Sequence, residues 1–252
     1  MKTYILIACF LAMASLAAKS QSHRFSDIRL TARVGFNLGG TAPVGLPASI
    51  RKLNSYTLQS NPIIGLEAEK PLGGRWGIMA GLHYENKGMK EDANVKNYHM
   101  AIVRGGQELD GMYTGNVSTE VNEWMFTVPV AATLHLGSRW RLHAGPYVSL
   151  LTQKSFEGRA HNGYLRVGDP TGPKVELGSE EGQRGTYDFT DDMRKLQYGI
   201  LVGVDVSLTP RFGLYADLEW GLSGVHKSGF KTIEQRLYPI FGVVGITYNI
   251  NK

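Results

Sequence analysis

Two pairs of side chains in this sequence have residue types suited to catalysis. His83 and Glu85 share one face of a strand, and His143 lies on the same face as Ser149. A base activates a nucleophile only within hydrogen-bond reach, and neither pair provides that reach within one strand or lies at a nucleophile elbow. We therefore expect no catalytic residues and interpret the histidines as hydrogen-bonded side chains. A triad assembled from neighbouring strands stays open as the alternative.

Metal and cofactor chemistry has little support in the spacing of ligand types. His83, His135 and His143 could face one another, but no pair has the close spacing of a metal site. The acidic residues between 154 and 194 lack the D-x-D-x-D-G spacing of a calcium loop, which indicates a solvated surface. The only cysteine, Cys9, lies in the N-terminal apolar segment. We expect neither a metal nor a cofactor.

The N-terminus predicts secretion. Lys2 precedes the apolar run Tyr4–Leu16, and small residues between 17 and 21 offer a cleavage site. This run is too short to cross a bilayer about 30 Å thick as a helix, so residues 1–21 are expected to be a cleaved signal peptide for Sec-type export. Residues 22–252 then form one domain. The formal charge of +5 includes no basic run, which argues against nucleic acid as a partner.

A two-residue period runs through the rest of the chain. Between 211 and 222 the even positions are apolar, from Phe212 to Leu222, whereas the odd positions carry mostly charge or glycine. Either a half-buried sheet or a membrane barrel produces such alternation. In all, we expect eight strands, near 29–39, 61–71, 75–87, 122–136, 139–153, 195–208, 211–222 and 236–249.

Three features favour an eight-stranded antiparallel up-and-down transmembrane β-barrel. The segments have about 11–15 residues, whereas soluble strands have about 5–6 and membrane strands need about 9–11. Tight turns alternate with long polar loops near 40–60, 88–121, 154–194 and 223–235, which places both termini in the periplasm. Aromatic side chains that end the apolar stripes are expected at the two membrane interfaces, namely Trp76, Tyr84, Trp124, Trp140, Phe212, Trp220 and Tyr248.

The opposite face of the strands carries charge and is predicted to line the lumen. A lipocalin-like soluble barrel, the alternative, would need an apolar interior instead. Because charges are costly in the narrow interior of eight strands, these acids and bases should pair into a plug rather than line a diffusion pore. A narrow or gated conductance is the alternative. The predicted lumen residues are Arg29, Arg33, Glu67, Glu69, His83, Glu85, Lys87, Glu123, Arg139, Arg141, His143, Asp205, Arg211, Asp217 and Glu219.

Three prolines fall inside the predicted strands. Pro129, Pro146 and Pro239 cannot donate to a ladder, and a closed barrel has no edge strand to hold them. We expect β-bulges or a local slip of the alternation at each of them.

Several local sequences carry a family resemblance. They are Gly65–Glu69 leading into Pro71–Gly74, Gly81–Gly88, Thr127–Val130, Ala144–Tyr147 and Gly242–Tyr248. They resemble the outer-membrane β-barrel domain of the porin-family and PorT-like proteins of Bacteroidota, over nearly all of the mature chain. The resemblance implies an outer-membrane barrel, and PorT itself is associated with protein secretion. The chain departs from this group at its end, where Asn-Ile-Asn-Lys follows Tyr248 in place of a final aromatic residue.

We expect a non-enzymatic protein of the Gram-negative outer membrane, with a structural or interaction role carried by its loops. Expected partners are outer-membrane lipid or lipopolysaccharide, the barrel assembly machinery, and a protein at the extracellular loops or the periplasmic face. Four loop tyrosines offer contacts for a protein or glycan: Tyr98, Tyr113, Tyr164 and Tyr187. The alternatives are a component of a secretion or transport apparatus and a small barrel enzyme acting on lipid or peptide.

Overall fold

A computed structural model describes residues 27–43, 45, 47–230, 232–233 and 236–251. The predicted signal peptide lies outside the described residues. Among the described residues, no helix has the length and apolar character needed to cross a membrane. The elements are β1 (Arg29–Pro43), β2 (Ile50–Thr57), β3 (Pro62–Gly73), β4 (Trp76–Arg104), β5 (Gln107–Leu136), β6 (Trp140–Val167), β7 (Lys174–Leu177), β8 (Gly185–Asp188), the 3-10 turn η1 (Thr190–Asp192), β9 (Leu196–Ser207), β10 (Phe212–Gly221) and β11 (Leu237–Asn249).

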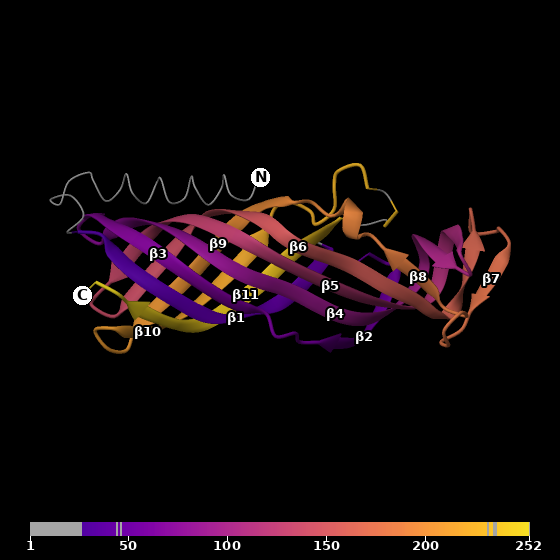
Figure 1. The fold of residues 1–252 in the computed structure, drawn as a ribbon, viewed down its shortest axis with the longest axis horizontal. Helices are drawn as coiled ribbons and strands as arrows, with labels where there is room; N and C mark the ends of the chain where they lie inside the picture. The colour runs from indigo at the N-terminus through magenta and orange to yellow at the C-terminus, as the bar shows by residue number, and fades with distance from the viewer. Residues whose placement is uncertain (1–26, 44, 46, 231, 234–235, 252) are drawn as a thin grey trace, which may run out of the picture.

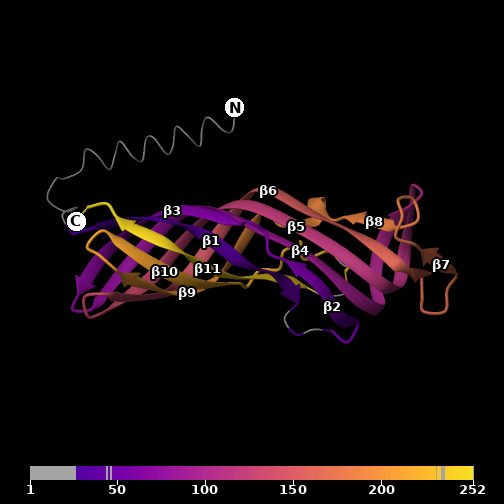
Figure 2. The same cartoon turned by 90° about the horizontal axis from the view of Figure 1, so that it is seen from below.

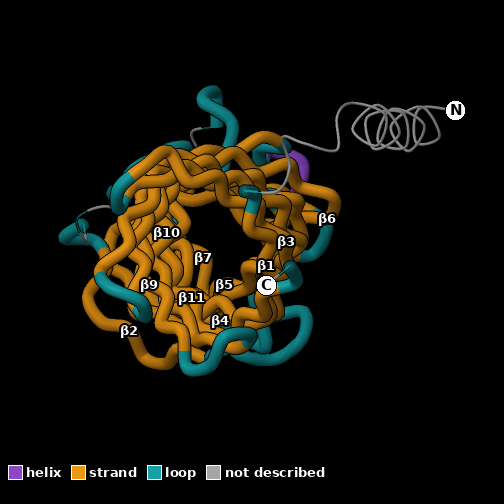
Figure 3. Tube along the Cα trace, turned by 90° about the vertical axis from the view of Figure 1, so that its left-hand side faces the viewer, coloured by secondary structure: helices purple, strands orange, loops and turns teal. Residues whose placement is uncertain are grey.

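Eight of the strands close into a ring. Each pairs antiparallel with its neighbour in the order β1, β3, β4, β5, β6, β9, β10 and β11, and β11 pairs back with β1. Figure 1 shows this barrel from the side, and Figure 3 shows the ring of strands from one end. The predicted eight-stranded up-and-down antiparallel barrel is confirmed.

The two-residue period places apolar side chains outside and polar ones inside. On β1, Val34 and Phe36 are 53% and 52% exposed, whereas Arg33, which directly precedes Val34, is 3% exposed. Successive side chains of a strand point to opposite faces, so one period serves lipid and lumen together. The exterior of the barrel is therefore an apolar belt.

The predicted interface aromatics lie at the two ends of this belt. Near the tight turns, Trp76 and Trp140 are exposed, and Phe212 packs on Tyr248 with ring centroids 5.1 Å apart. At the other end, Tyr84 stacks on Trp124 at 5.2 Å, and Trp220 is 40% exposed. We call the first end the short-turn end and the other the far end. β11 ends at the short-turn end, where Asn249 pairs with Thr31 of β1 (Figure 1).

The prediction of bulges at the three strand prolines is wrong. Val128 pairs with Val148 and Ala132 with Ala144 in one unbroken register, so Pro129 and Pro146 shift nothing. Pro239 likewise keeps the register of β11 with β1. Each proline removes one donor from the ladder, but the barrel on both sides fixes the phase. The irregularities of β5 lie elsewhere, between Thr114 and Asn116 and between Trp124 and Met125, both toward β6.

The segments predicted as long polar loops at the far end are strands over most of their length. β4, β5 and β6 have 29, 30 and 28 residues and continue well past the belt, with a tight turn at Gly105 and Gly106. Figures 1 and 2 show these three strands leaving the barrel together, with β7 and β8 at their far end. We call residues 88–121 and 154–167 with β7 and β8 the extension.

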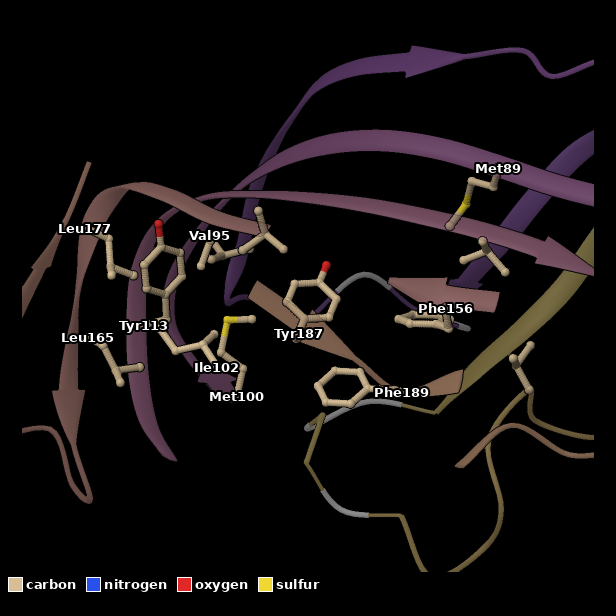
Figure 4. Packing of buried hydrophobic residues seen from close by; sticks show 14 of the residues in the cluster. Met89, Val95, Met100, Ile102, Tyr113, Phe156, Leu165, Leu177, Tyr187 and Phe189 are labelled. Carbon is tan, nitrogen blue, oxygen red and sulfur yellow. The ribbon is translucent and has the colours of Figure 1, made fainter. Parts of the chain in front are cut away.

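The extension has an apolar core of its own. β8 pairs with β6 and bridges to β4, which brings the outer edges of the three-strand sheet together. Inward side chains such as Val95, Tyr113, Val117, Phe156 and Leu165 pack there (Figure 4). The face polarity is therefore inverted beyond the belt, because water replaces lipid outside and apolar side chains move inside.

Candidate functional site

Arg33 occupies the middle of the lumen. Its guanidinium contacts Glu67 at 2.5 Å and Asp217 at 2.7 Å, and it lies over the Tyr215 ring at 3.7 Å. These partners come from β3 and β10, on either side of β1 and β11 around the ring. His83 Nε2 on β4 approaches Glu67 at 3.3 Å. One arginine thus joins side chains of strands that lie three places apart around the ring.

A second group lies nearer the short-turn end, around Arg141. Its guanidinium contacts Asp205 at 2.9 Å, Glu69 at 3.1 Å and Glu67 at 3.2 Å. His143 lies between Asp205, at 3.1 Å from Nδ1, and Asp217, at 3.0 Å from Nε2. Glu67 contacts both Arg33 and Arg141, and Asp217 contacts both Arg33 and His143. The two groups therefore form one network.

A third group lies nearer the far end, around Lys87. Its ammonium contacts Glu219 at 2.5 Å and Glu85 at 3.2 Å. Glu85 also accepts hydrogen bonds from Thr127 and from Asn37 at 2.9 Å. All of these side chains are buried. Beside this group, Gln197 donates to Glu123 at 2.7 Å.

Three of the predicted lumen residues lie outside the buried interior. Arg29, Arg139 and Arg211 are exposed at the short-turn end, where Arg29 and Arg139 border a cavity of about 280 Å³. Acidic groups outnumber basic ones in the buried part of the lumen. Among the described residues, seven buried carboxyl groups, those of Glu67, Glu69, Glu85, Glu123, Asp205, Asp217 and Glu219, face three buried basic side chains, those of Arg33, Lys87 and Arg141. His83 and His143, also buried, contact acids of this set.

The fold does not assemble either of the two pairs, His83 with Glu85 and His143 with Ser149, into a catalytic arrangement. His83 contacts Glu67, and Glu85 contacts Lys87 and Thr127. Ser149 Oγ exchanges a hydrogen bond with Thr127 at 2.8 Å, whereas His143 contacts aspartates. The structure therefore gives these side chains lumen contacts in place of a nucleophile and its base.

The extension brings together a serine, a histidine and an aspartate that the sequence analysis missed. Ser118 Oγ donates to Asp92 at 2.6 Å, and His161 Nε2 lies 3.1 Å from Ser118 and 2.9 Å from Asp92. Burial raises the pKa of Asp92, but hydrogen bonds from Ser118, Asn54 and His161 outweigh it and lower that pKa. A catalytic relay needs both imidazole nitrogens, one for each partner. Here a single nitrogen faces both, so the group joins strands β4, β5 and β6.

Two of the four tyrosines predicted to contact a partner are core residues of the extension. Tyr113 is fully buried and Tyr187 is 6% exposed. Tyr187 stacks on Phe189, with ring centroids 5.1 Å apart. Tyr98 packs against this core, and Tyr164 lies beside Lys174, whose ammonium is 4.5 Å from its ring. The signal for burial was present in the sequence, because apolar residues alternate from Leu109 to Val121.

An aromatic cluster at the base of the extension surrounds His226. Its ring stacks on Phe230 at 4.4 Å and meets Phe156 edge-on at 4.6 Å. Burial lowers the pKa of His226 to about 4, with Asp192 raising it and Lys154 lowering it. The imidazole is therefore neutral at pH 7.

A closed barrel with an apolar outer belt and a charged interior defines an outer-membrane β-barrel. Residues 19–227 match the family model described as outer membrane protein beta-barrel domain. The chain belongs to this family, and its place is the outer membrane of a Gram-negative bacterium.

Several solved outer-membrane proteins are similar to this chain. Neisserial surface protein A is 11% identical with a TM-score of 0.40, and the match covers 89% of this chain and 98% of that one. The attachment invasion locus protein Ail of Yersinia pestis, solved with the heparin analogue sucrose octasulfate, is 10% identical with a TM-score of 0.39, covering 89% and 99%. OprG of Pseudomonas aeruginosa is 10% identical with a TM-score of 0.33, covering 89% and 96%. No curated protein matches.

Proposed function

We propose that this protein is a non-enzymatic outer-membrane barrel that presents the extension outside the cell as an interaction surface. The observation that carries the proposal is the extension itself. A membrane strand needs about 9–11 residues, whereas β5 has 30, and the excess folds around its own core. A rigid platform outside a membrane is where recognition usually resides.

The lumen supports a sealed barrel rather than a pore. Arg33, Lys87 and Arg141 bridge carboxylates of different strands across the interior, and all three are buried. Removing one partner from such a buried network leaves a charge uncompensated, so the network resists opening. Its role in this proposal is to hold the wall of the barrel and close its interior.

Planar-bilayer recording tests the sealed lumen. The purified protein is expected to show no stepwise conductance at voltages that a reconstituted general porin, used as the positive control, tolerates while conducting. A stable conductance that persists in the wild-type protein would show that the interior is a water-filled path.

Shortening the extension tests the interaction role. Asp92 and Ser118 are cross-strand partners, so a two-residue Asn-Gly turn between them replaces residues 93–117 without changing the register. A strain that lacks the protein is expected to lose the surface interaction proposed for the extension. The full chain should restore this interaction, and the shortened chain should not. Both proteins must resist SDS until heated, which shows that the barrel has assembled.

Two outcomes of this experiment contradict the proposal. Full rescue by the shortened chain would show that the extension is dispensable. Secreted proteins trapped in the periplasm of the deletion strain, and released by the shortened chain, would instead favour a part in a secretion apparatus.

A further inference from the structure

An apolar cavity of about 810 Å³ lies at the base of the extension. Its inner wall is formed by core side chains, among them Met89, Met100 and Phe156. Figure 4 shows these three pointing into the shared interior of the extension. Its outer rim includes Leu53 and Leu58, which are 51% and 64% exposed. The cavity thus joins the interior of the protein to its outer surface, and its size is that of a small-molecule site.

The cavity exists because the barrel wall is incomplete at this height. β3 begins at Pro62, whose partner on β1 is Phe36, so β1 continues to Pro43 without β3 beside it. β2 fills this place and, among the described residues, pairs with β4 but not with β1. Tyr56 of β2 donates a side-chain hydrogen bond to the Gly39 carbonyl of β1. The two strands leave a lateral opening between them.

This opening lies at the level of the membrane interface. Gly40, on the rim, pairs with Ile240, which pairs with the interface residue Trp220. Leu38, also on the rim, is 42% exposed and belongs to the apolar belt. A hydrocarbon chain in the adjoining leaflet therefore reaches the opening along apolar surface, without crossing water.

The charges around the cavity distinguish its mouth from its interior. Arg51 and Lys52 of β2 border it and are exposed. Glu91, on the inner face of β4, also borders the cavity. Burial raises the pKa of its carboxyl group, which favours the neutral form. A cationic mouth above an apolar interior matches a ligand with a negative head and an apolar tail.

We propose that this cavity binds the aliphatic chain of a long-chain carboxylate, which enters sideways from the membrane between β1 and β2. The chain lies against Met89, Met100 and Phe156, and the carboxylate stays at the mouth beside Arg51 and Lys52. This inference goes beyond the interaction role of the extension, and it holds whether or not the extension binds a partner.

Photo-labelling tests the proposal in the membrane. The full chain, in vesicles of phosphatidylethanolamine and phosphatidylglycerol, is illuminated with a 16-carbon fatty acid that carries a diazirine near its methyl end. Mass spectrometry is expected to find label on the inward residues Met89, Met100 or Phe156, and excess palmitate is expected to reduce it at least tenfold. Label confined to outward residues such as Ile78 and Val128, or unaffected by palmitate, would mean that only lipid around the barrel was labelled, and would overturn the proposal.

Matched variants locate the chain and its head. Ala93→Trp fills the cavity and is expected to abolish the inward label, whereas Ala132→Trp on the exposed face of β5 leaves it unchanged. Arg51→Glu with Lys52→Glu is expected to reduce labelling by the carboxylate several-fold but not by the alcohol of the same length. Equal or stronger labelling by the corresponding amine would refute the cationic mouth. If Ala93→Trp fails to assemble, the position of the label in the unaltered chain still tests whether the cavity holds the aliphatic chain.

Discussion

Arg33 is a central side chain of the lumen network. It contacts two carboxylates of different strands and is buried with them. Arg33→Met removes the cation that Glu67 and Asp217 share. We expect this substitution to lower the free energy of unfolding by about 3–5 kcal/mol. Urea titration in lipid vesicles measures this loss, and the temperature at which SDS unfolds the barrel should fall with it.

The matched control for this substitution is Arg139→Met. Arg139 is exposed at the short-turn end, so its loss should change the free energy of unfolding by less than about 1 kcal/mol. Equal effects of the two substitutions would show that the buried network does not stabilise the barrel.

The neutral His226 makes the base of the extension sensitive to acid. Its pKa is about 4 in the fold and about 6.5 when the segment opens. The open segment therefore takes up the proton first, and the free energy of local opening falls as pH drops from about 6.5 to 4. The slope is at most about 1.4 kcal/mol per pH unit. Above pH 6.5 it should be flat.

Hydrogen exchange checks this pH dependence. The amides of Arg194 and Lys227 bond to Val225 and Asp192 across the base of the extension, and their protection, corrected for intrinsic exchange, should fall in this window. In His226→Phe, which keeps an aromatic ring but no titrating group, the slope should disappear. A variant with an unchanged slope would show that His226 is not the group responsible.

At the scale of the strand, close approach of β1 and β11 depends on small residues. Gly245 pairs with Gly35, and a Cβ on Gly245 would come within 2.2 Å of the Val34 carbonyl oxygen and 2.6 Å of the Tyr215 ring. That ring holds the Arg33 guanidinium. Gly245→Ala should therefore strain both the ladder and the network, at a cost of about 1–3 kcal/mol.

Gly229→Ala is the control for this strand prediction. A Cβ added there meets nothing within 4 Å, so the temperature of unfolding in SDS should stay at its wild-type value. If Gly245→Ala were as stable as Gly229→Ala, β1 and β11 would have room to separate, and the tight pairing would not be required.

The strands of the belt could be predicted from sequence because lipid imposes one rule on every position. Phe212, Leu214 and Leu218 must face out, and this fixes the phase of β10 by itself. The partners inside the lumen could not be predicted, because they depend on the stagger between strands. Arg33 and Asp217 are 184 positions apart in the chain. The extension was missed since its alternation has the opposite polarity, which resembles a polar loop when membrane strands are sought.

At the scale of the molecule, the extension should behave as a folded unit under proteolysis. Glu180 and Glu181 lie in an exposed turn between β7 and β8, whereas Glu120 is exposed but held in β5. A glutamate-specific protease needs a locally unfolded segment. In the micelle-bound protein it should cut after Glu180 or Glu181 well before Glu120, as mass spectrometry of the fragments would show. Comparable cutting at Glu120 would mean that the strands of the extension open readily.

The length of β4, β5 and β6 also decides how the protein responds to mechanical force. Traction on the far tip runs along these strands, while the ladder from Trp140–Val206 to Leu150–Leu196 holds β6 to β9 within the barrel. Hydrogen bonds of a sheet lie across the strands, so this ladder is loaded in shear and its bonds must fail together. Tension at the tip is therefore distributed over the whole length of this ladder, and we expect the barrel to resist unfolding when the extension is pulled.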